Sequence, residues 1–266
     1  MLFDIIKGLR VGAINKPRLL IKAKRVQFIR SVLFKTIFYT STVLFIIFMA
    51  LASIFSPKPR PIMRCIEGYG SYVLWLARWM VGVKTHFIGF DKLPENPPYI
   101  VCPKHESTMD VFLLISRVKY VTALGKSEYF DLPIMGFLLR RMGILSVIRN
   151  KGTAHMELPD MKNYMEKDPR PLLIYPEGTR VKLGNRVKLK SGAWHIQQET
   201  GLDVYPIATN VASLWPRKKI LINPGTVIME VGEVIKPGLD KEAFIAELEK
   251  RVVDRSIALR DPDALK

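Results

Sequence analysis

Apolar and polar positions follow two alternating patterns along most of the chain. Short apolar runs typical of buried strands are separated by longer segments with helical periodicity. Strands are expected near Tyr99, Val121, Ile144, Leu172 and Val204, and helices near Val111, Ile134, Met156 and Ala193. This alternation predicts an α/β fold with a largely parallel central sheet flanked by helices.

The last part of the chain carries two further patterns. Two apolar runs, Lys219–Ile222 and Val227–Val231, bracket a turn-forming segment at residues 223–226, as in a hairpin. Beyond them, Asp240 can cap a charged amphipathic helix that extends to about Leu259. We therefore expect a hairpin followed by a C-terminal helix.

The N-terminal part contains a long apolar stretch. Thr36–Ser56 has no charged residue, and as a helix it would span about 31 Å, near the thickness of the hydrocarbon core of a bilayer. A buried core helix is the alternative, but uniform hydrophobicity and basic flanks favour a membrane segment.

A second apolar segment, Gly68–Val83, follows a proline-rich turn or break at residues 57–61. On a helix, its Tyr72, Trp75 and Trp79 share one face, which is typical of an interfacial helix. The two segments together predict a two-helix, membrane-embedded anchor.

The chain is strongly basic, with a formal net charge of +17. Residues 1–60 hold eleven Lys or Arg against Asp4 alone. This excess requires an anionic partner, either membrane lipids or nucleic acid. Basic clusters at Arg140-Arg141 and residues 217–219 motivate the second hypothesis. No recognisable nucleic-acid motif accompanies them, and lipid headgroups explain charge beside an apolar anchor, so membrane lipids are the expected partner.

Two parts are predicted: residues 1–83, a basic N-terminus with membrane-embedded or interfacial helices, and residues 84–266, the α/β domain. The chain has two cysteines, Cys65 and Cys102, which provide no disulfide framework. Cys65 is too isolated to build a metal site, and no metal is expected.

Three histidines have an aspartate five residues later, so their surroundings must distinguish them. His86 lies in a strand-like segment, where side chains five apart point to opposite faces. His155 and its aspartate flank Pro159, where a helix starts or breaks at a solvated surface. His105 follows the apolar run 99–103 and precedes Ser107, a plausible helix N-cap. Its setting is strand, turn, helix.

This setting allows His105 and Asp110 to meet, because a contact at this spacing requires the histidine before the helix and the aspartate in its first turn. Asp110 would orient the imidazole, and the other ring nitrogen could take a proton from a hydroxyl. Ser107 and Asp110 also have capping-box spacing, so Asp110 could be a structural cap only.

A second motif follows a predicted buried strand at residues 171–175. Ligands gather where the strands of α/β sheets end. In the following turn, Gly178 allows a tight backbone bend, and the planar fork of Arg180 matches phosphate or carboxylate. The alternative is a surface arginine in a turn.

These motifs resemble the glycerolipid acyltransferase family, and most closely the lysophosphatidic acid acyltransferases. That family carries four motifs in order, and the resemblance covers roughly residues 99–210. The matches here are His105 with Asp110, Gly143–Arg149, Glu177–Arg180 and Val204–Ile207. Lys126 and the segment Lys190-Ser191-Gly192 fall where the family has basic residues. Two departures are Lys104, where the family often has Asn, and Tyr205, inserted before the proline of the fourth motif.

The resemblance implies transfer of a fatty acyl group from a thioester, on coenzyme A or acyl carrier protein, to the free hydroxyl of lysophosphatidic acid. The product would be phosphatidic acid, and no cofactor beyond the acyl donor is implied. The implied catalytic residues are His105, as general base, and Asp110. The implied substrate-binding residues are Lys126, Arg149, Glu177, Gly178, Thr179 and Arg180. Of these, Arg180, with Arg149 and Lys126, would hold the phosphate. Glu177 would orient neighbouring groups or pair with a local arginine.

The implied thioester also constrains the topology. A basic N-terminus stays inside, and a single crossing would carry His105 outside, away from the acyl donor. The chain is therefore expected to return, which places the enzyme domain on the cytoplasmic face of the cell (inner) membrane.

Two alternatives remain open within the enzyme hypothesis. Ser107 or Cys102 could accept the acyl group covalently, although the chain has no Gly-x-Ser-x-Gly elbow. The acceptor could be another lysophospholipid, a lyso-ornithine lipid or glycerol 3-phosphate.

Overall fold

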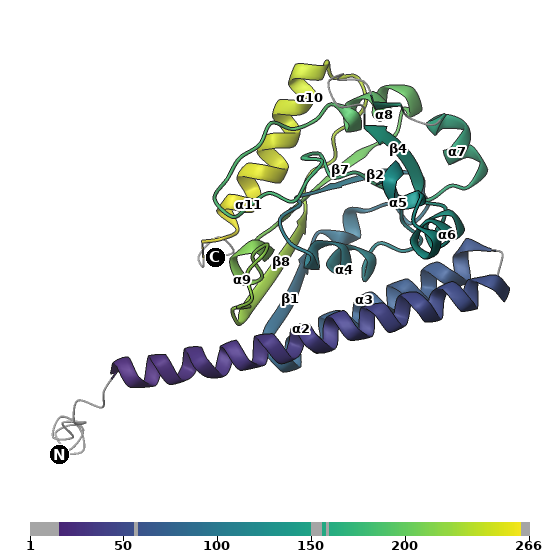
Figure 1. Cartoon of the computed structure of the whole chain (residues 1–266). Coiled ribbons are helices and arrows are strands. Elements are labelled where there is room, and N and C mark those ends of the chain that lie inside the picture. The colour runs from purple at the N-terminus through teal and green to yellow at the C-terminus, as the bar shows by residue number, and fades with distance from the viewer. Residues whose placement is uncertain (1–15, 56–57, 150–155, 158–159, 262–266) are drawn as a thin grey trace.

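The structure, a computed structural model, describes residues 16–55, 58–149, 156–157 and 160–261. A central sheet carries helices on both faces, and a long helix, α2, runs along one side of the molecule (Figure 1). The N-terminal part of α2 extends beyond the rest of the protein (Figure 1).

Within the described residues, eight strands form one sheet in the order β1-β8-β7-β2-β6-β3-β4-β5. Neighbouring strands are parallel, except that β8 is antiparallel to β7 and β5 to β4. The strands are β1 (Val83–Ile88), β2 (Ile100–Pro103), β3 (Thr122–Lys126), β4 (Leu145–Arg149), β5 (Met156–Glu157), β6 (Leu172–Leu173), β7 (Val204–Thr209) and β8 (Gly225–Val231). The prediction of a largely parallel sheet is confirmed, and all five predicted strands are present.

The helices surround this sheet. They are α2 (Lys16–Phe55), α3 (Pro59–Val81), η1 (Phe90–Lys92), α4 (Met109–Ile115), α5 (Ser127–Phe130), α6 (Pro133–Met142), α7 (Met161–Lys167), α8 (Gly192–Thr200), α9 (Val211–Leu214), α10 (Lys241–Leu248), η2 (Glu249–Asp254) and α11 (Arg255–Ala258). The last three elements follow one another without a break and form the predicted C-terminal helix. Its predicted cap is confirmed, because Asp240 Oδ1 accepts a hydrogen bond from the Ala243 N–H at 2.7 Å.

Strand β2 shows how the core forms on both faces of the sheet. All four of its residues are buried, as expected for a central parallel strand. Ile100 and Cys102 join the apolar cluster that includes residues of α7, α8 and α10, whereas Val101 joins the cluster that includes residues of α3 and α4. This period-2 alternation anchors β2 from both sides, so the loop that follows it starts from a fixed position.

The predicted hairpin near residues 219–231 is wrong. Val227–Val231 does form strand β8, but Lys219–Ile222 lies in a loop, and β8 pairs with β1 and β7 instead. The physical reason lies on α2. The Ile222 N–H donates to Ser31 Oγ at 3.1 Å, and its carbonyl accepts from Gln27 Nε2 at 2.8 Å. The buried backbone of Ile222 is therefore satisfied by helix side chains rather than by a partner strand.

The helix expected near Met156 is also misplaced. Met156–Glu157 pairs with β4 as the short edge strand β5. The helix, α7, begins after Asp160, whose Oδ1 accepts a hydrogen bond from the Asn163 N–H at 2.9 Å. The N-cap, rather than the preceding apolar residue, fixes where this helix starts. His155 lies outside the described residues.

Two N-terminal helices, α2 and α3, are present, but both are longer than the apolar stretches that predicted them. Helix α3 begins inside the proline-rich segment because proline at the first helical position needs no amide donor. Within the described residues, one segment, Lys24–Phe55 of α2, is apolar and long enough to cross a bilayer, judged by length and composition. Trp75 and Trp79 on α3 are 56% and 65% exposed.

These helices also pack on the sheet domain. Phe34 and Phe38 of α2 are buried and contact Trp215, with ring centroids 5.2 and 5.5 Å apart. Residues of α2, α3 and the sheet share one apolar cluster. The core is therefore continuous across residue 83, and a boundary there stays a prediction.

Candidate active site

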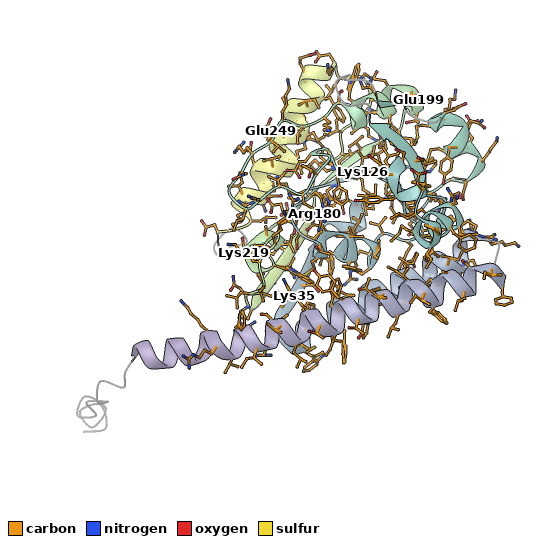
Figure 2. The ribbon with its side chains drawn as sticks, viewed as in Figure 1. Lys35, Lys126, Arg180, Glu199, Lys219 and Glu249 are labelled. Carbon is orange, nitrogen blue, oxygen red and sulfur yellow. The ribbon has the colours of Figure 1, made fainter. Side chains whose placement is uncertain are left out.

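The carboxyl ends of adjacent parallel strands bring the two main motifs together. Strands β2 and β6 are hydrogen-bonded neighbours in register, with Ile100 opposite Leu172. The His105 loop (residues 104–108) follows β2, and the Arg180 turn (residues 176–180) follows β6 shortly after its end. Strand β3 lies on the other side of β6 and ends at Lys126. Figure 2 labels Lys126 and Arg180 in the same part of the domain, above α2.

Backbone contacts connect the His105 loop to its neighbours. The His105 N–H donates to Glu177 Oε2 at 2.8 Å, and the His105 carbonyl accepts from the Val181 N–H at 2.8 Å. The Lys104 N–H donates to the Ile207 carbonyl on β7 at 2.9 Å. The loop is therefore held between the fourth motif and the Arg180 turn.

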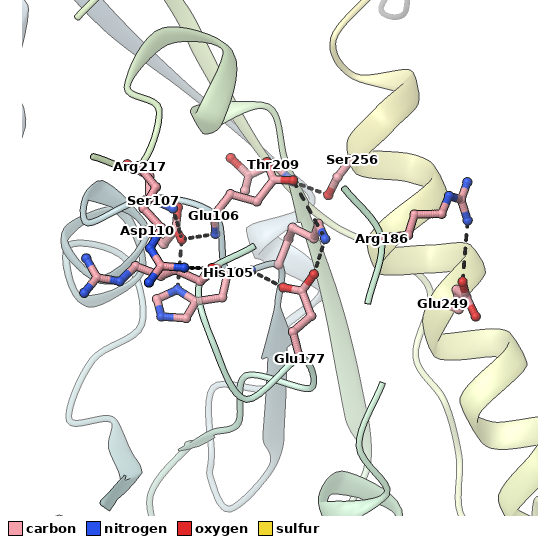
Figure 3. A network of polar contacts seen from close by, with 12 residues as sticks. His105, Glu106, Ser107, Asp110, Glu177, Arg186, Thr209, Arg217, Glu249 and Ser256 are labelled. Carbon is pink, nitrogen blue, oxygen red and sulfur yellow. Dashed lines mark hydrogen bonds and ion pairs between the residues drawn. The ribbon is translucent and has the colours of Figure 1, made fainter. Parts of the chain in front are cut away.

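His105 and Asp110 are in contact, with Nδ1 and Oδ2 3.0 Å apart. The same carboxylate oxygen accepts the N–H groups of Glu106 at 2.7 Å and Ser107 at 2.8 Å (Figure 3). Helix α4 begins at Met109, so the cap position falls on Thr108, one residue later than predicted. Ser107 Oγ still accepts from the Met109 N–H at 3.2 Å. Asp110 thus both caps the helix start and contacts the imidazole, so the two interpretations do not exclude each other.

Tyr175, which sequence reasoning missed, stacks on the imidazole of His105 with ring centroids 3.8 Å apart. Its hydroxyl has no hydrogen-bond partner within the part of the chain that the structure describes. Burial raises the pKa of this hydroxyl well above its usual range. Tyr175 follows β6, so its ring reaches His105 only through the pairing of β6 with β2.

Glu177 pairs with Lys104, not with a local arginine as one alternative expected. The Lys104 ammonium contacts Glu177 Oε1, and both side chains are almost completely buried. Burial raises the pKa of the Glu177 carboxyl, and the Lys104 charge opposes this shift. The departure at Lys104 therefore has a local role in hydrogen bonding, and Glu177 accepts from two groups of the His105 loop.

A cavity of about 1210 Å³ opens at this end of the sheet. The predicted site residues that line it are His105, Lys126, Gly178, Thr179 and Arg180. Lys190, from the basic segment that the sequence indicated, also lines it, and three further cations in its wall were not assigned to the site from the sequence: Lys188, Arg217 and Lys241. The opening is therefore suited to an anionic ligand.

Arg180 is exposed at this cavity, and both its side chain and its backbone carbonyl are held by hydrogen bonds. Its Nη1 donates to Thr108 Oγ1 at 2.8 Å, and its carbonyl accepts from Arg217 Nη1 at 2.5 Å. Arg217 belongs to a basic cluster that the sequence offered as a nucleic-acid signal. The same cluster could have indicated a cation at this site.

The remaining predicted residues lie around this cavity or outside the description. Asp110 and Glu177 are buried behind the lining. Arg149 ends β4, the strand beside β3, but its side chain lies outside what the structure describes. Val204–Ile207 are the buried first part of β7, and none of these four residues is in the described lining of the cavity. Among the described residues, no three His, Cys, Asp or Glu side chains gather as metal ligands.

Residues 84–210 match the family described as Acyltransferase. A 1-acyl-sn-glycerol-3-phosphate acyltransferase of Pseudomonas aeruginosa is 27% identical over 70% of this chain and 72% of that protein. The corresponding Arabidopsis thaliana enzyme LPAT1 is 30% identical over 47% of this chain, but the match spans only 35% of that protein.

The fold of the chain is also similar to that of a solved acyltransferase structure. The crystal structure of the 1-acyl-sn-glycerophosphate acyltransferase PlsC from Thermotoga maritima superposes with a TM-score of 0.70. The match covers 88% of this chain and 98% of that one at 20% identity, which shows a shared fold. The sequence match, the shared fold and the order of the motifs all agree: residues 84–210 form a domain of the acyltransferase family.

Proposed function

We propose that this acyltransferase moves a fatty acyl group from an acyl thioester to the free hydroxyl of lysophosphatidic acid, giving phosphatidic acid. One observation carries the proposal: His105, in contact with the buried Asp110, faces a cavity that Arg180 and other cations line. The curated relatives that bear this activity in their names support the choice of acceptor.

His105 would act as the general base. Asp110 Oδ2 accepts two backbone N–H groups, so this oxygen acts as an acceptor and carries no proton. In its contact with His105 the donor must therefore be Nδ1–H. The other ring nitrogen, Nε2, is then an acceptor and can take the proton of the glycerol hydroxyl. General-base catalysis of this kind typically contributes about 10²- to 10⁴-fold.

The transfer then follows without further reagents. The deprotonated hydroxyl oxygen bonds to the thioester carbonyl carbon, and the carbon–sulfur bond breaks as the carbonyl reforms. The thiolate takes the proton from the His105 imidazolium, which restores the neutral base. Asp110 would stabilise the imidazolium between these steps, because a buried carboxylate favours the nearby positive charge.

The cations of the cavity would bind the phosphate groups of both substrates. Arg180, with Lys126 and Arg149, would hold the phosphate monoester of the acceptor through charge-assisted hydrogen bonds. Lys188, Lys190 and Lys241 would meet the phosphates of the donor, coenzyme A or acyl carrier protein. Glu177, Gly178 and Thr179 would shape the Arg180 turn. A Cβ at Gly178, where φ is +64°, would lie 3.0 Å from Lys190.

Direct transfer is favoured over a covalent acyl-enzyme. Ser107 is buried, and its hydroxyl accepts a hydrogen bond from the start of α4. Cys102 is buried in the sheet, and burial raises the pKa of its thiol far from neutrality, so the thiolate nucleophile is not available. Another lysolipid, a lyso-ornithine lipid or glycerol 3-phosphate stays the alternative acceptor.

The enzyme would work at the cytoplasmic face of the cell membrane, with α2 and α3 as an anchor that enters the bilayer and returns. The apolar outer surface of α2 and the exposed tryptophans of α3 support this arrangement. Protease added to the cytoplasmic side of sealed vesicles should digest the domain after residue 83. Protection of that domain would show the topology to be wrong, and removal by high salt would favour a peripheral nucleic-acid binder.

The activity is tested by thiol release from an acyl thioester. Purified full-length protein in vesicles is assayed with and without lysophosphatidic acid, and wild type is compared with His105→Ala. His86→Ala, a histidine on β1, is the matched control. We expect acceptor-dependent release that collapses only in His105→Ala. Release without acceptor would indicate a thioesterase, and no release with any acceptor would contradict the proposed activity.

A further inference from the structure

Four charged side chains form a continuous row behind His105. Arg260 Nη2 lies 2.6 Å from Glu106 Oε1, and Lys104 Nζ lies 3.8 Å from the same oxygen. Lys104 also contacts Glu177, which accepts the His105 N–H. Lys104, Glu106 and Glu177 are at most 2% exposed. The row therefore connects Arg260, 154 residues away from Glu106 in sequence, to the backbone of His105.

Both neighbours of His105 in the chain belong to this row. Lys104 is held through Glu177, and Glu106 is held by Arg260 on one side and by Asp110 on the other, through its own N–H. A loop residue whose two neighbours are fixed has little freedom to shift its backbone, and the backbone sets the point from which its side chain extends. The position of the imidazole thus depends on Arg260 through Glu106.

Glu106 needs a counter-charge where it lies. Its side chain is fully buried, and its Oε2 has no hydrogen-bond partner among the described residues. Burial raises the pKa of Glu106 to about 7, and the strongest opposing effect comes from Arg260, followed by Lys104. Without Arg260, the carboxylate would either take up a proton or draw Lys104 away from Glu177. Either change loosens the loop that carries His105.

Arg260 is itself held in place by the end of the C-terminal helix. Ser256 Oγ accepts the Thr209 N–H at 3.0 Å (Figure 3), and the Leu259 carbonyl accepts from Asn210 Nδ2 at 3.2 Å. Thr209 ends β7, the strand beside β2. The C-terminal helix is therefore bound to the same end of the sheet that carries the site, where the strands have their carboxyl ends. This helix lies outside the residues that match the family.

We infer that Arg260 is a positioning residue of the acyl-transfer site: it holds the buried Glu106 and so fixes the loop that carries His105. The inference rests on the role proposed for His105. Neither Arg260 nor Glu106 belongs to the described lining of the cavity. Removing Arg260 alone should therefore lower turnover and leave substrate binding nearly unchanged.

Four variants of the full-length protein test this role: Arg260→Gln, Glu106→Gln, the double variant, and Arg255→Gln as the matched control. Arg255 lies on the same helix and pairs with Glu230 at 2.8 Å, away from the His105 loop. The readouts are kcat and KM for the acyl thioester and lysophosphatidic acid in vesicles. We expect Arg260→Gln to lower kcat about 10- to 100-fold with KM changed less than about twofold, as small misplacements of reacting groups do. Arg255→Gln should keep its kcat.

The double variant separates positioning from general destabilisation. Two neutral amides leave no unpaired buried charge and can bond to each other, so the double variant should regain most of the kcat lost in Arg260→Gln. A kcat in Arg260→Gln equal to that of Arg255→Gln, or a double variant no more active than Arg260→Gln, would overturn the inference. If Arg260→Gln does not fold, an active double variant supports it and an inactive one overturns it. Retained activity in His105→Ala would instead contradict the proposed function.

Discussion

The phenol ring of Tyr175 lies against the imidazole of His105, with ring centroids 3.8 Å apart and ring planes inclined by 20°. Asp110 contacts the same imidazole at Nδ1 from the start of α4. The ring is thus held on a face by a residue that follows β6 and at an edge by a residue that follows β2. Two adjacent strands together determine where its free nitrogen points.

Tyr175 should act through its ring and not through its hydroxyl. The hydroxyl is buried without a described partner, a situation that typically costs about 1–3 kcal/mol. Tyr175→Phe should therefore keep kcat and raise the free energy of unfolding by about 1 kcal/mol, measured by denaturant titration in detergent. Tyr175→Ala should lower kcat about tenfold because the imidazole loses its support.

The two substitutions check each other. Loss of activity in Tyr175→Phe would assign a chemical role to the hydroxyl and contradict this account. Full activity in Tyr175→Ala would show that Asp110 alone suffices to hold His105.

Asp110 is expected to contribute more to turnover than to stability. In Asp110→Asn the amide oxygen can still accept the N–H groups of Glu106 and Ser107, but the negative charge beside the imidazole is lost. We expect kcat to fall by about 10²-fold or more, while the loss of unfolding free energy stays near 1 kcal/mol.

Asp160→Asn is the matched control, because Asp160 caps α7 through the Asn163 N–H and contacts no histidine in the described residues. It should show a comparable change in stability and unchanged kcat. An equal and small effect of both variants on kcat would reduce Asp110 to a helix cap.

The parts of this site that are local in sequence could be predicted, and the parts that depend on distant partners could not. The contact of His105 with Asp110 follows from a strand, a turn and a helix start within a few residues. The partner of Glu177 is Lys104, 73 residues away, and nothing near Glu177 in the chain indicates it. Glu106 and Arg260 are a second such pair.

The same distinction applies to the fold. Apolar runs flanked by turn residues predicted the parallel strands correctly, because burial on both faces imposes that pattern. The hairpin strand expected at Lys219–Ile222 is wrong because Ile222 is buried in a loop, whereas Ile220 is exposed. Side chains of α2, far upstream in the chain, satisfy the backbone there.

Arg180 should determine affinity for an acceptor that carries a phosphate. Its side chain is exposed at the cavity. The hydrogen bond to Thr108 uses the donor at Nη1, so the N–H groups of Nη2 and Nε do not take part in that contact. Arg180→Gln should raise KM for lysophosphatidic acid about tenfold or more with a smaller change in kcat. A monoacylglycerol, which lacks the phosphate, should be used equally poorly by wild type and variant.

Arg186→Gln is the control, since Arg186 lies a few residues beyond the Arg180 turn but pairs with Asp254 at 2.7 Å on the C-terminal helix. Its KM should stay near the wild-type value. If both arginine variants raise KM equally, the effect is general electrostatics and not a specific phosphate contact.

Stability should fall as pH rises from about 5 to about 7, and Glu106 should be one source of this slope. Burial raises its pKa from 4.5 to about 7 in the folded chain. Between these values the folded state holds a proton that the unfolded state has released, so raising the pH favours unfolding. The resulting loss of unfolding free energy is about 1–3 kcal/mol. It is complete near pH 7 and absent below the pKa that Glu106 has in the unfolded chain.

Glu106→Gln isolates this effect. Melting temperatures in detergent, measured from pH 5 to pH 8, should decline less steeply in the variant than in wild type. Glu177, whose pKa burial also raises, should leave a residual slope of the same sign. Parallel curves for the two proteins would mean that Glu106 is ionised throughout this range.

Trp75 and Trp79 should lie at the membrane interface. Both are exposed on α3, beside the apolar outer surface of α2, and tryptophan prefers the headgroup region of bilayers. The other two tryptophans differ in position: Trp215 is 3% exposed, and Trp194 donates to the Leu239 carbonyl at 3.1 Å near the C-terminal helix.

In vesicles, brominated lipids should therefore quench the fluorescence of wild type strongly. A variant with Trp75→Phe and Trp79→Phe should be quenched much less, while the converse variant, with Trp194→Phe and Trp215→Phe, should be quenched at least as strongly as wild type. Equal quenching of the two double variants would place α3 away from the bilayer and leave α2 as the anchor.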